Sequence, residues 1–452
     1  MDRVLKLVYD NWYETIPLSN GIHPVLVNHI KSAITGIETA EATARSLMDS
    51  DMFPFRWHNN FFKYFKDYVK IHPDQINDDD CIYIYPIEIR NSLSSLYKDY
   101  IVSLGGNNLR YNIGDTFSPK ILKYLQSGKV KLVINYIHDP ISDEDELLEF
   151  DSFLEALGVD CRNIIVVAGN EFTSTNTNIR VVSGPLLFPR EDAERMLTRP
   201  RQGRLGYMND YVKEHDLDFS KLRPHKFICF NRQLAYRTHR ITLAYLALKY
   251  DLLNHNVFSF LEKIDEKQVL DNTRAWDKYY KNIDIQRVAR HIVKMLPWEI
   301  DTHALSQSEK TNFSTHNNKK ELYLNTYIHI VSETRFHDGT SPFISEKTYR
   351  PIANLQPFLY IGNYNSLRDL HALGFKTFHP YINEDYDIEQ DPEKRMTMIE
   401  QELKKLNDLT LEQIHKLYYN VKDILIYNRN HLTTFVNAQP YQNLIRELQN
   451  GI

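Results

Sequence analysis

Polar residues follow a predicted buried strand in the second half of the chain. Lys226–Phe230 is an apolar run typical of a buried strand. Asn231, Arg232 and Arg237 come next, before the following predicted helix. Guanidinium groups bind phosphate oxygens in pairs, and the N-terminus of a helix adds backbone N–H groups and a favourable dipole. We therefore expect Arg232 or Arg237 to bind a phosphate group; salt bridges to nearby acidic residues are the alternative.

A second polar group surrounds the start of a later helix. An apolar run ends at Ser332-Glu333, and Ser345 is a predicted N-cap with Glu346 and Lys347 in the first helical turn. A carboxylate at a helix start can accept hydrogen bonds from two ribose hydroxyls, while an adjacent lysine and the free backbone N–H groups face a diphosphate. The alternative is that Glu346 only complements the helix dipole.

Three pieces of this region resemble the donor-binding half of the α-1,3-fucosyltransferase-like glycosyltransferases, and more closely their relatives in tailed phages and giant viruses. The pieces are Ser332-Glu333, then Phe343-Ile344-Ser345-Glu346-Lys347-Thr348, then Pro351-Ile-Ala with Gln356-Pro-Phe-Leu-Tyr-Ile-Gly362. An Asn-Arg strand end followed by Arg and His precedes the Ser-Glu-Lys helix in those relatives, as here. The resemblance covers residues 226–380.

The resemblance implies a GT-B architecture, a nucleotide sugar bound by the C-terminal domain, and inverting transfer without a metal or other cofactor. Glu346 resembles the ribose-binding Glu and Lys347 the diphosphate-binding Lys. The expected donor-binding residues are Asn231, Arg232, Arg237, Glu333, Ser345, Glu346 and Lys347. At Pro351–Gln356 the sequence departs from the Ala/Gly-rich stretch usual in fucosyltransferases, so the resemblance does not identify fucose as the sugar. The base of the donor, uridine or guanosine, also stays open.

Candidate catalytic bases follow predicted strands of the first half. Inverting transfer needs a base that takes the proton of the acceptor hydroxyl, and Asp, Glu or His can serve. Asp139 and His138 come directly after the apolar run Val130–Ile137, and Glu171 follows the strand Ile164–Ala168. We rank Asp139 first, then His138, then Glu171. The alternative for Asp139 is that it caps the acidic helix that follows.

Other motifs of catalysis and metal binding are missing from the sequence. The glycine-rich phosphate loops, H-E-x-x-H and G-x-S-x-G do not occur. Five Asp-x-Asp pairs are scattered among 59 acidic residues, as solvated loops would produce, so we expect no metal site. Three cysteines form neither a disulfide framework nor a zinc cluster.

The elements that would position these residues alternate between strands and helices, which indicates parallel sheets. We predict an α/β chain with two Rossmann-like domains. Its parts are a helical, aromatic-rich segment (1–75), an acceptor domain (76–190), a linker (191–222), a nucleotide-sugar domain (223–395) and C-terminal helices (396–452). Within them we expect a helix over Leu93–Val102 that Gly105-Gly106 ends, and a strand over Leu322–Ser332.

The distribution of charge suggests which residues contact the acceptor, and the hydropathy of the chain suggests its cellular compartment. The net charge is −5, but residues 180–240 hold 13 Lys/Arg and 7 Asp/Glu, a local charge of 13 − 7 = +6. We expect this stretch to contact an acceptor through Arg195, Arg199, Arg201 and Arg204. The apolar runs fall short of the ~20 residues of a membrane helix, and the charged start Met1–Lys6 is unlike a signal peptide, so we expect a cytoplasmic protein. The oligomeric state is not predicted.

Two classes of function remain after these exclusions. The leading hypothesis is a glycosyltransferase acting on hydroxymethylated or glycosylated bases of phage DNA, in the host cytoplasm. The same enzyme class with a polysaccharide or small-molecule acceptor is the first alternative. A non-catalytic protein that binds nucleic acid or polysaccharide is the second.

Overall fold

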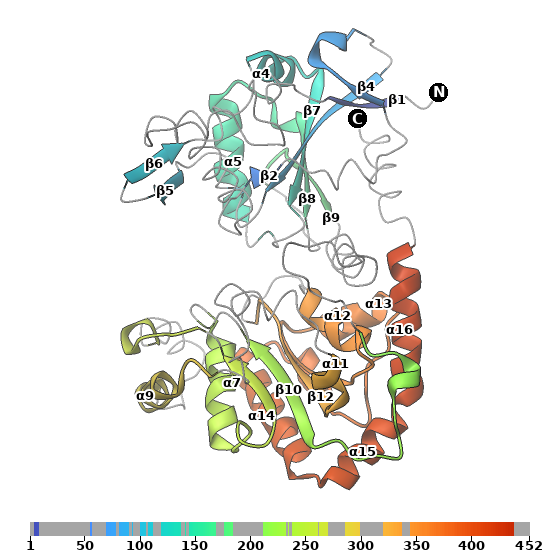
Figure 1. Cartoon of the computed structure of the whole chain (residues 1–452). Helices are drawn as coiled ribbons and strands as arrows, with labels where there is room; N and C mark the ends of the chain where they lie inside the picture. Colours follow the sequence, from blue (N-terminus) through green and yellow to red (C-terminus); the bar gives the residue numbers. More distant parts are fainter. Residues whose placement is uncertain are drawn as a thin grey trace. The chain divides into compact units, whose positions relative to one another are not determined.

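The computed structural model divides the chain into two units. One contains Met1–Phe188 and Gln439–Ile452, and the other Pro189–Ala438 (Figure 1). The residues that the structure describes are 4–8, 55–56, 69–77, 81–89, 93, 100–104, 107–111, 119–136, 141, 144–168, 176–183, 211–231, 234, 237–260, 262–269, 285–298, 320–336 and 344–437. No helix in this part of the chain combines the length and the hydropathy that crossing a membrane requires.

The first unit is built on a seven-stranded sheet. Its described elements are β1 (Val4–Val8), β2 (Phe55–Arg56), β3 (Val69–Ile71), β4 (Cys81–Ile89), β5 (Tyr100–Leu104), β6 (Asn107–Tyr111), α4 (Pro119–Gln126), β7 (Val130–Tyr136), α5 (Glu144–Ala156), β8 (Ile164–Ala168) and β9 (Arg180–Ser183). The order is β3-β1-β4-β7-β8-β9, all parallel, and β2 pairs antiparallel with β4. Strand β8 is buried along its whole length, and β7 at every residue except Lys131, because helices cover both faces of a parallel sheet.

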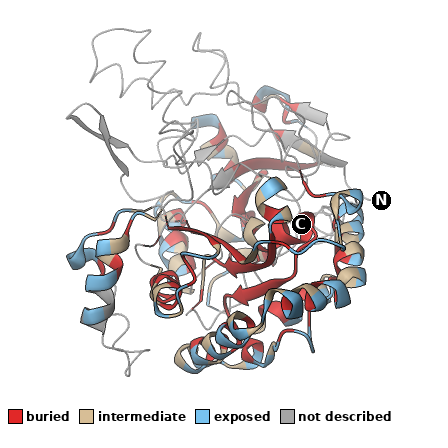
Figure 2. Cartoon of the chain, turned by 60° about the horizontal axis from the view of Figure 1, so that its bottom comes forward, coloured by how far each residue is buried: buried red, intermediate tan, exposed pale blue. Residues whose placement is uncertain are grey.

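The second unit holds a four-stranded parallel sheet in the order β11-β10-β12-β13. Its described elements are β10 (His225–Asn231), α7 (Thr238–Lys249), β11 (Val257–Phe260), α9 (Ile285–Met295), α11 (Lys320–Leu324), β12 (Thr326–Ser332), α12 (Glu346–Ala353), β13 (Phe358–Ile361), α13 (Ser366–Ala372), α14 (Pro392–Asp408), α15 (Leu411–Asn420) and α16 (Lys422–Asn437). Its strands form the buried centre of the unit, and the helices expose their outer faces (Figure 2).

The order of the second sheet reverses between β10 and β12. From β10 the chain moves outward through α7 to β11, and from β12 it moves the other way through α12 to β13. Because parallel crossovers are right-handed, α7 and α12 cover opposite faces of the sheet. The electrostatics agree: Arg240 of α7 acts on Cys229, and Arg350 of α12 acts on His329, whose side chain points to the other face. Ligands of open parallel sheets bind outside the carboxyl ends of the strands at such a reversal.

The prediction of an α/β chain with two parallel sheets and a helical C-terminus is confirmed. The capping box of Thr410 and Gln413 begins α15, and the predicted apolar stripe Ile414, Leu417, Val421 and Leu425 is buried. Parts of the N-terminal prediction are wrong. Strands β1, β2 and β3 lie in the segment 1–75 that was predicted to be helical. Pairing with β3 and β4 satisfies the backbone groups of β1.

Two further elements differ from the prediction. Residues 100–104, expected at the end of a helix, form β5, which pairs antiparallel with β6. Gly105-Gly106 lies between them in the sequence, and a two-residue glycine pair between two short strands is a hairpin signal. The predicted strand Leu322–Ser332 begins only at Thr326, because Thr326 is where pairing with β10 starts at His225. The preceding residues form α11.

Candidate functional site

The candidate site lies at the carboxyl ends of β10 and β12. The register Ile228↔His329 places Asn231 beside Ser332, the last residues of the two strands. Both side chains are buried, and Asn231 Oδ1 and Ser332 Oγ have no hydrogen-bond partner among the described residues. The amide nitrogen of Asn231 donates weakly to Cys229 Sγ at 3.2 Å. Asn231 thus stands at the predicted strand end, with its carbonyl oxygen unused.

The N-terminus of α12 brings three predicted donor-binding residues together at this edge. Ser345 is the N-cap, and its Oγ accepts a hydrogen bond from Lys347 N at 3.4 Å. The side chains of Glu346 and Lys347 are 18% and 27% exposed and form an ion pair with Nζ–Oε1 at 2.8 Å. Lys347 Nζ also donates to Ser345 Oγ at 3.2 Å and to Thr334 Oγ1 at 3.3 Å. A positive and a negative side chain are therefore held at one helix start.

Glu346 is ionised at neutral pH. Burial alone would raise the pKa of its carboxyl, but the Lys347 ammonium and its hydrogen bond, together with Arg350, lower that pKa to about 2. An ionised carboxylate is an acceptor only. At this position it can accept hydrogen bonds from the hydroxyls of a ligand.

Glu333 was expected to bind the donor, which requires an accessible side chain, but the structure buries it. Its side chain is completely buried. Oε1 accepts hydrogen bonds from Ser345 N (3.1 Å) and Thr348 Oγ1 (2.6 Å), and Oε2 from Ser345 Oγ (2.6 Å) and Thr334 N (3.3 Å). The N-terminal N–H groups of a helix need acceptors, and Glu333, directly after β12, supplies one to Ser345 N. It supports α12 rather than lining the site.

Basic residues at the start of α7 hold the turn after β12. Arg237 Nη1 donates to Thr334 O at 2.7 Å, and His239 Nε2 contacts Glu333 O at 2.8 Å. Arg240 Nη2 donates to Glu333 O (3.0 Å) and Ser332 O (3.3 Å). Burial, and then the neighbouring Arg237, lowers the pKa of Arg240 to about 10. Arg237 therefore contacts the turn beside the candidate site with one N–H directed at the backbone, and its binding of a phosphate stays a prediction.

The remaining predicted site residues lie outside the residues that the structure describes. They are the candidate bases His138, Asp139 and Glu171, the candidate phosphate ligand Arg232, and the candidate acceptor contacts Arg195, Arg199, Arg201 and Arg204. In the described part of the chain, no three His, Cys, Asp or Glu side chains form a group that could hold a metal ion.

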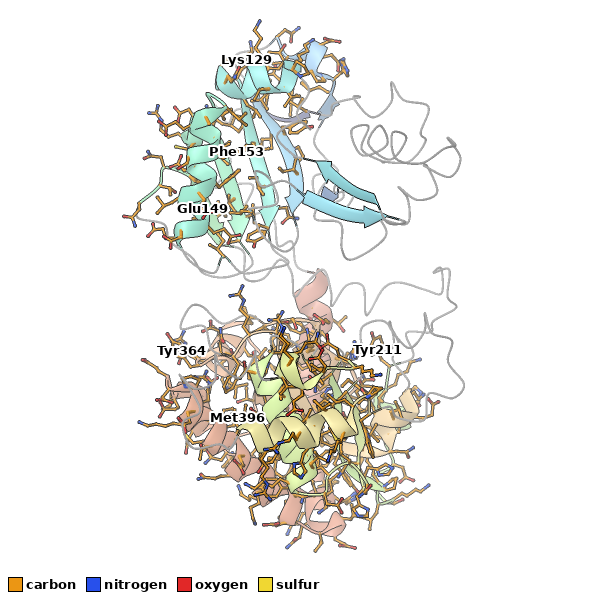
Figure 3. All side chains as sticks on the ribbon, turned by 90° about the vertical axis from the view of Figure 1, so that its left-hand side faces the viewer. Lys129, Glu149, Phe153, Tyr211, Tyr364 and Met396 are labelled. Atoms are coloured by element: carbon orange, nitrogen blue, oxygen red, sulfur yellow. The ribbon has the colours of Figure 1, made fainter. Side chains whose placement is uncertain are left out.

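Figure 3 shows the side chains of the two units. Phe153 of α5 packs against the core of the first unit, and Met396 of α14 is buried in the second.

Three residues of the site carried too weak a sequence signal. Thr334 and Thr348 contact Lys347 and Glu333 through hydroxyls, and threonine is common in loops and helices alike. His239 was one of several basic residues after β10. Its contacts with Glu333 and Phe336, more than 90 positions away, depend on the fold.

Comparisons with known proteins found similarity among solved structures alone. No family model and no curated protein matches the chain. A UDP-forming α,α-trehalose-phosphate synthase from Burkholderia xenovorans is 10% identical, with 86% of this chain and 96% of that chain covered and a TM-score of 0.33. A glycosyltransferase from Rickettsia africae is 10% identical over 99% of both chains, with a TM-score of 0.36. TM-scores below 0.5 at this identity carry no argument about substrate or mechanism.

Proposed function

We propose that this chain is a glycosyltransferase that moves a sugar from a nucleotide sugar to an acceptor hydroxyl. The observation that carries the proposal is the start of α12. Ser345, Glu346 and Lys347 stand at a helix N-terminus beside the strand ends where the order of the second sheet reverses. That is the place where open parallel sheets bind nucleotides.

Each group at this helix start matches one part of a nucleotide sugar. The Glu346 carboxylate accepts hydrogen bonds from the two ribose hydroxyls, and Lys347 with the positive end of the helix dipole faces the diphosphate. Arg232 or Arg237 adds a guanidinium to the phosphates. The Ser-Glu-Lys and Gln-Pro-Phe motifs resemble the α-1,3-fucosyltransferase-like GT-B enzymes in the same residues, which supports the same assignment.

The transfer is proposed to be inverting and metal-independent. Asp139 is our first choice as the base that deprotonates the acceptor, followed by His138 and Glu171. Cationic side chains stabilise the departing diphosphate in place of a metal. We expect full activity in EDTA. Complete loss of activity in the chelator, restored by Mn²⁺ or Mg²⁺, would contradict this part of the proposal.

A panel of nucleoside diphosphates tests the proposal directly. We expect UDP or GDP to raise the melting temperature of the protein, and the matching nucleotide sugar to release free diphosphate slowly without an acceptor. The nucleoside alone, which lacks the diphosphate, is the control and should shift the melting temperature much less. No shift with any nucleoside diphosphate and no release from any common nucleotide sugar would overturn the proposal. A shift without release would favour a non-catalytic binding protein.

The proposed acceptor is DNA with hydroxymethylated or glycosylated bases, as in a phage-infected cell. Arg195, Arg199, Arg201 and Arg204 supply cations for phosphate contacts. The target base would have to be extruded, or its substituent reached in the major groove. Transfer of radiolabelled sugar to modified DNA, and none to unmodified DNA, is the expected result. Label on a polysaccharide or small molecule instead would assign the acceptor to that class.

A further inference from the structure

The turn after β12, residues Ser332–Phe336, is held in place by two helices distant in sequence. His239 and Arg240 of α7, with Arg237 just before it, contact the carbonyls of Ser332, Glu333 and Thr334. From α14, the guanidinium of Arg395 donates a short hydrogen bond to Phe336 O. The backbone of the turn is therefore tied on both sides.

The ring of Phe336 joins the two helices. It stacks on the imidazole of His239, with centroids 5.4 Å apart and an interplanar angle of 19°. The guanidinium carbon of Arg395 lies 4.5 Å from its centroid. Phe336, His239 and Arg395 are each at least 98% buried, so they are well packed and remote from solvent. A ring held between two such partners has little freedom to move.

Residues of this turn hold the start of α12 in place. Glu333 accepts the Ser345 N–H and the Ser345 and Thr348 hydroxyls, and Thr334 Oγ1 accepts from Lys347 Nζ. A displacement of Glu333 or Thr334 would thus move both Ser345 and Lys347. Binding groups must be held within about 0.5 Å of their working geometry by the residues behind them.

We infer that His239 and Arg395 are positioning residues of the nucleotide site, acting through Phe336 and the turn Ser332–Phe336. Neither touches Glu346 or Lys347 in the contacts described above. The inference rests on the proposed function, because it presumes that a nucleotide binds at α12. It adds Arg395 of α14, which lies outside the residues of the resemblance (226–380), and gives His239 a positioning role.

Matched pairs of variants test the inference. His239→Leu removes the contact with Glu333 O, whereas His239→Gln keeps an N–H at the position of Nε2. Arg395→Met removes the hydrogen bonds and the charge over Phe336, whereas Arg395→Lys keeps the charge. We expect His239→Leu and Arg395→Met to weaken binding of the nucleoside diphosphate about tenfold, equivalent to about 1.4 kcal/mol. His239→Gln and Arg395→Lys should recover much of that loss.

Controls come from the opposite, amino-terminal edge of the same sheet. His415 contacts Tyr327 OH at 2.9 Å and Phe219 O at 3.0 Å. Arg223 is buried, donates to Tyr323 O and Thr326 O, and lies over the rings of Tyr327 and Tyr418. His415→Leu and Arg223→Met should lower the melting temperature by a comparable amount and leave nucleotide affinity unchanged.

Three outcomes separate the inference from the proposed function. If wild type binds no nucleoside diphosphate, the proposed function fails and the inference fails with it. If wild type binds and His239→Leu and Arg395→Met lose no more affinity than the two controls, the inference alone is overturned. If a leucine or methionine variant does not fold, Phe336→Leu, which removes the ring that both residues contact, is compared with the same two controls. A loss of affinity in Phe336→Leu no greater than in the controls would then count against a positioning role.

Discussion

At the start of α12, the Glu346 carboxylate and the Lys347 ammonium form an ion pair. Replacing Lys347 or Glu346 by alanine should weaken nucleoside diphosphate binding more than tenfold, about 1.4 kcal/mol or more, while the fold survives because both side chains are partly exposed. Isothermal titration calorimetry measures the change. Lys249 and Glu400 form a comparable ion pair at the other end of α7, with Nζ–Oε1 at 2.6 Å. Alanine at either should leave affinity intact. Unchanged affinity in both α12 variants would remove this site.

His329 makes the stability of the second unit depend on pH. Burial, and then Arg350, lowers the pKa of its imidazole from 6.5 to about 3. The unfolded chain therefore binds a proton below about pH 6.5 that the folded chain binds only near pH 3. The contribution of His329 to the free energy of unfolding is therefore fully present above pH 6.5. It is lost as the pH falls from 6.5 toward 3, by up to ~1.4 kcal/mol per pH unit.

The matching variant is His329→Phe, which keeps a ring beside Phe230 and Tyr323 and removes the titrating group. Urea unfolding at pH 7 and pH 5 should show a smaller loss of stability in the variant than in wild type. Equal losses in the two proteins would show that His329 does not carry this dependence.

At the scale of elements, α12 depends on the carboxylate of Glu333, the residue directly after β12. In Glu333→Gln, either orientation of the amide sets an NH₂ group against a backbone N–H, since Ser345 N faces Oε1 and Thr334 N faces Oε2. We expect a loss of about 1–3 kcal/mol and faster amide exchange at the start of α12, with weaker nucleotide binding.

The comparison for this variant is Thr410→Ala, which removes the N-cap of α15. It should cost about 1 kcal/mol and leave both the exchange of α12 and the nucleotide affinity as they are. Unaltered amide exchange at Ser345–Lys347 in Glu333→Gln would show that Glu333 does not stabilise the start of α12.

The elements were predictable where their signals are local. Ser345 as the N-cap of α12 and the pair Thr410 and Gln413 were read from neighbouring residues, and the structure has both. The burial of Glu333 was not predictable, because its partners Ser345 and Thr348 lie 12 and 15 positions away across a loop. Contacts such as Arg395 with Phe336 depend on how α14 packs, which no local pattern encodes. The hairpin of β5 and β6 was missed because Gly105-Gly106 also ends helices.

At the scale of the whole molecule, each of the two units has its own largely parallel sheet. In the first sheet the order reverses between β1 and β4, and β7 lies next to β4. His138 and Asp139 follow β7 in sequence, one strand from that reversal. Ligands of parallel sheets bind at reversals, so this edge of the first sheet is where we expect the acceptor.

The charge of the whole chain bears on whether that acceptor is DNA. The net charge is −5, and residues 180–240 have a local charge of +6. Part of that local charge is inaccessible to a polyanion. Arg223 and Arg240 in this stretch are buried in the second unit and donate to backbone carbonyls. The proposed contact with DNA is assigned to Arg195, Arg199, Arg201 and Arg204. If each neutralises one phosphate, the rate of transfer at low DNA concentration should fall with salt at a log–log slope of about −3 to −4.

Changing the four arginines to serine should flatten this slope and leave nucleoside diphosphate binding unaltered, because the donor groups at α12 are untouched. The measurement is the initial rate of label transfer between roughly 50 and 200 mM salt, the range over which phosphate contacts lose most affinity. A neutral glycan or small molecule releases no counterions when it binds, so its rate would stay nearly constant over that range. A flat profile with wild type on modified DNA would move the acceptor to a polysaccharide or a small molecule, with the donor site unaffected.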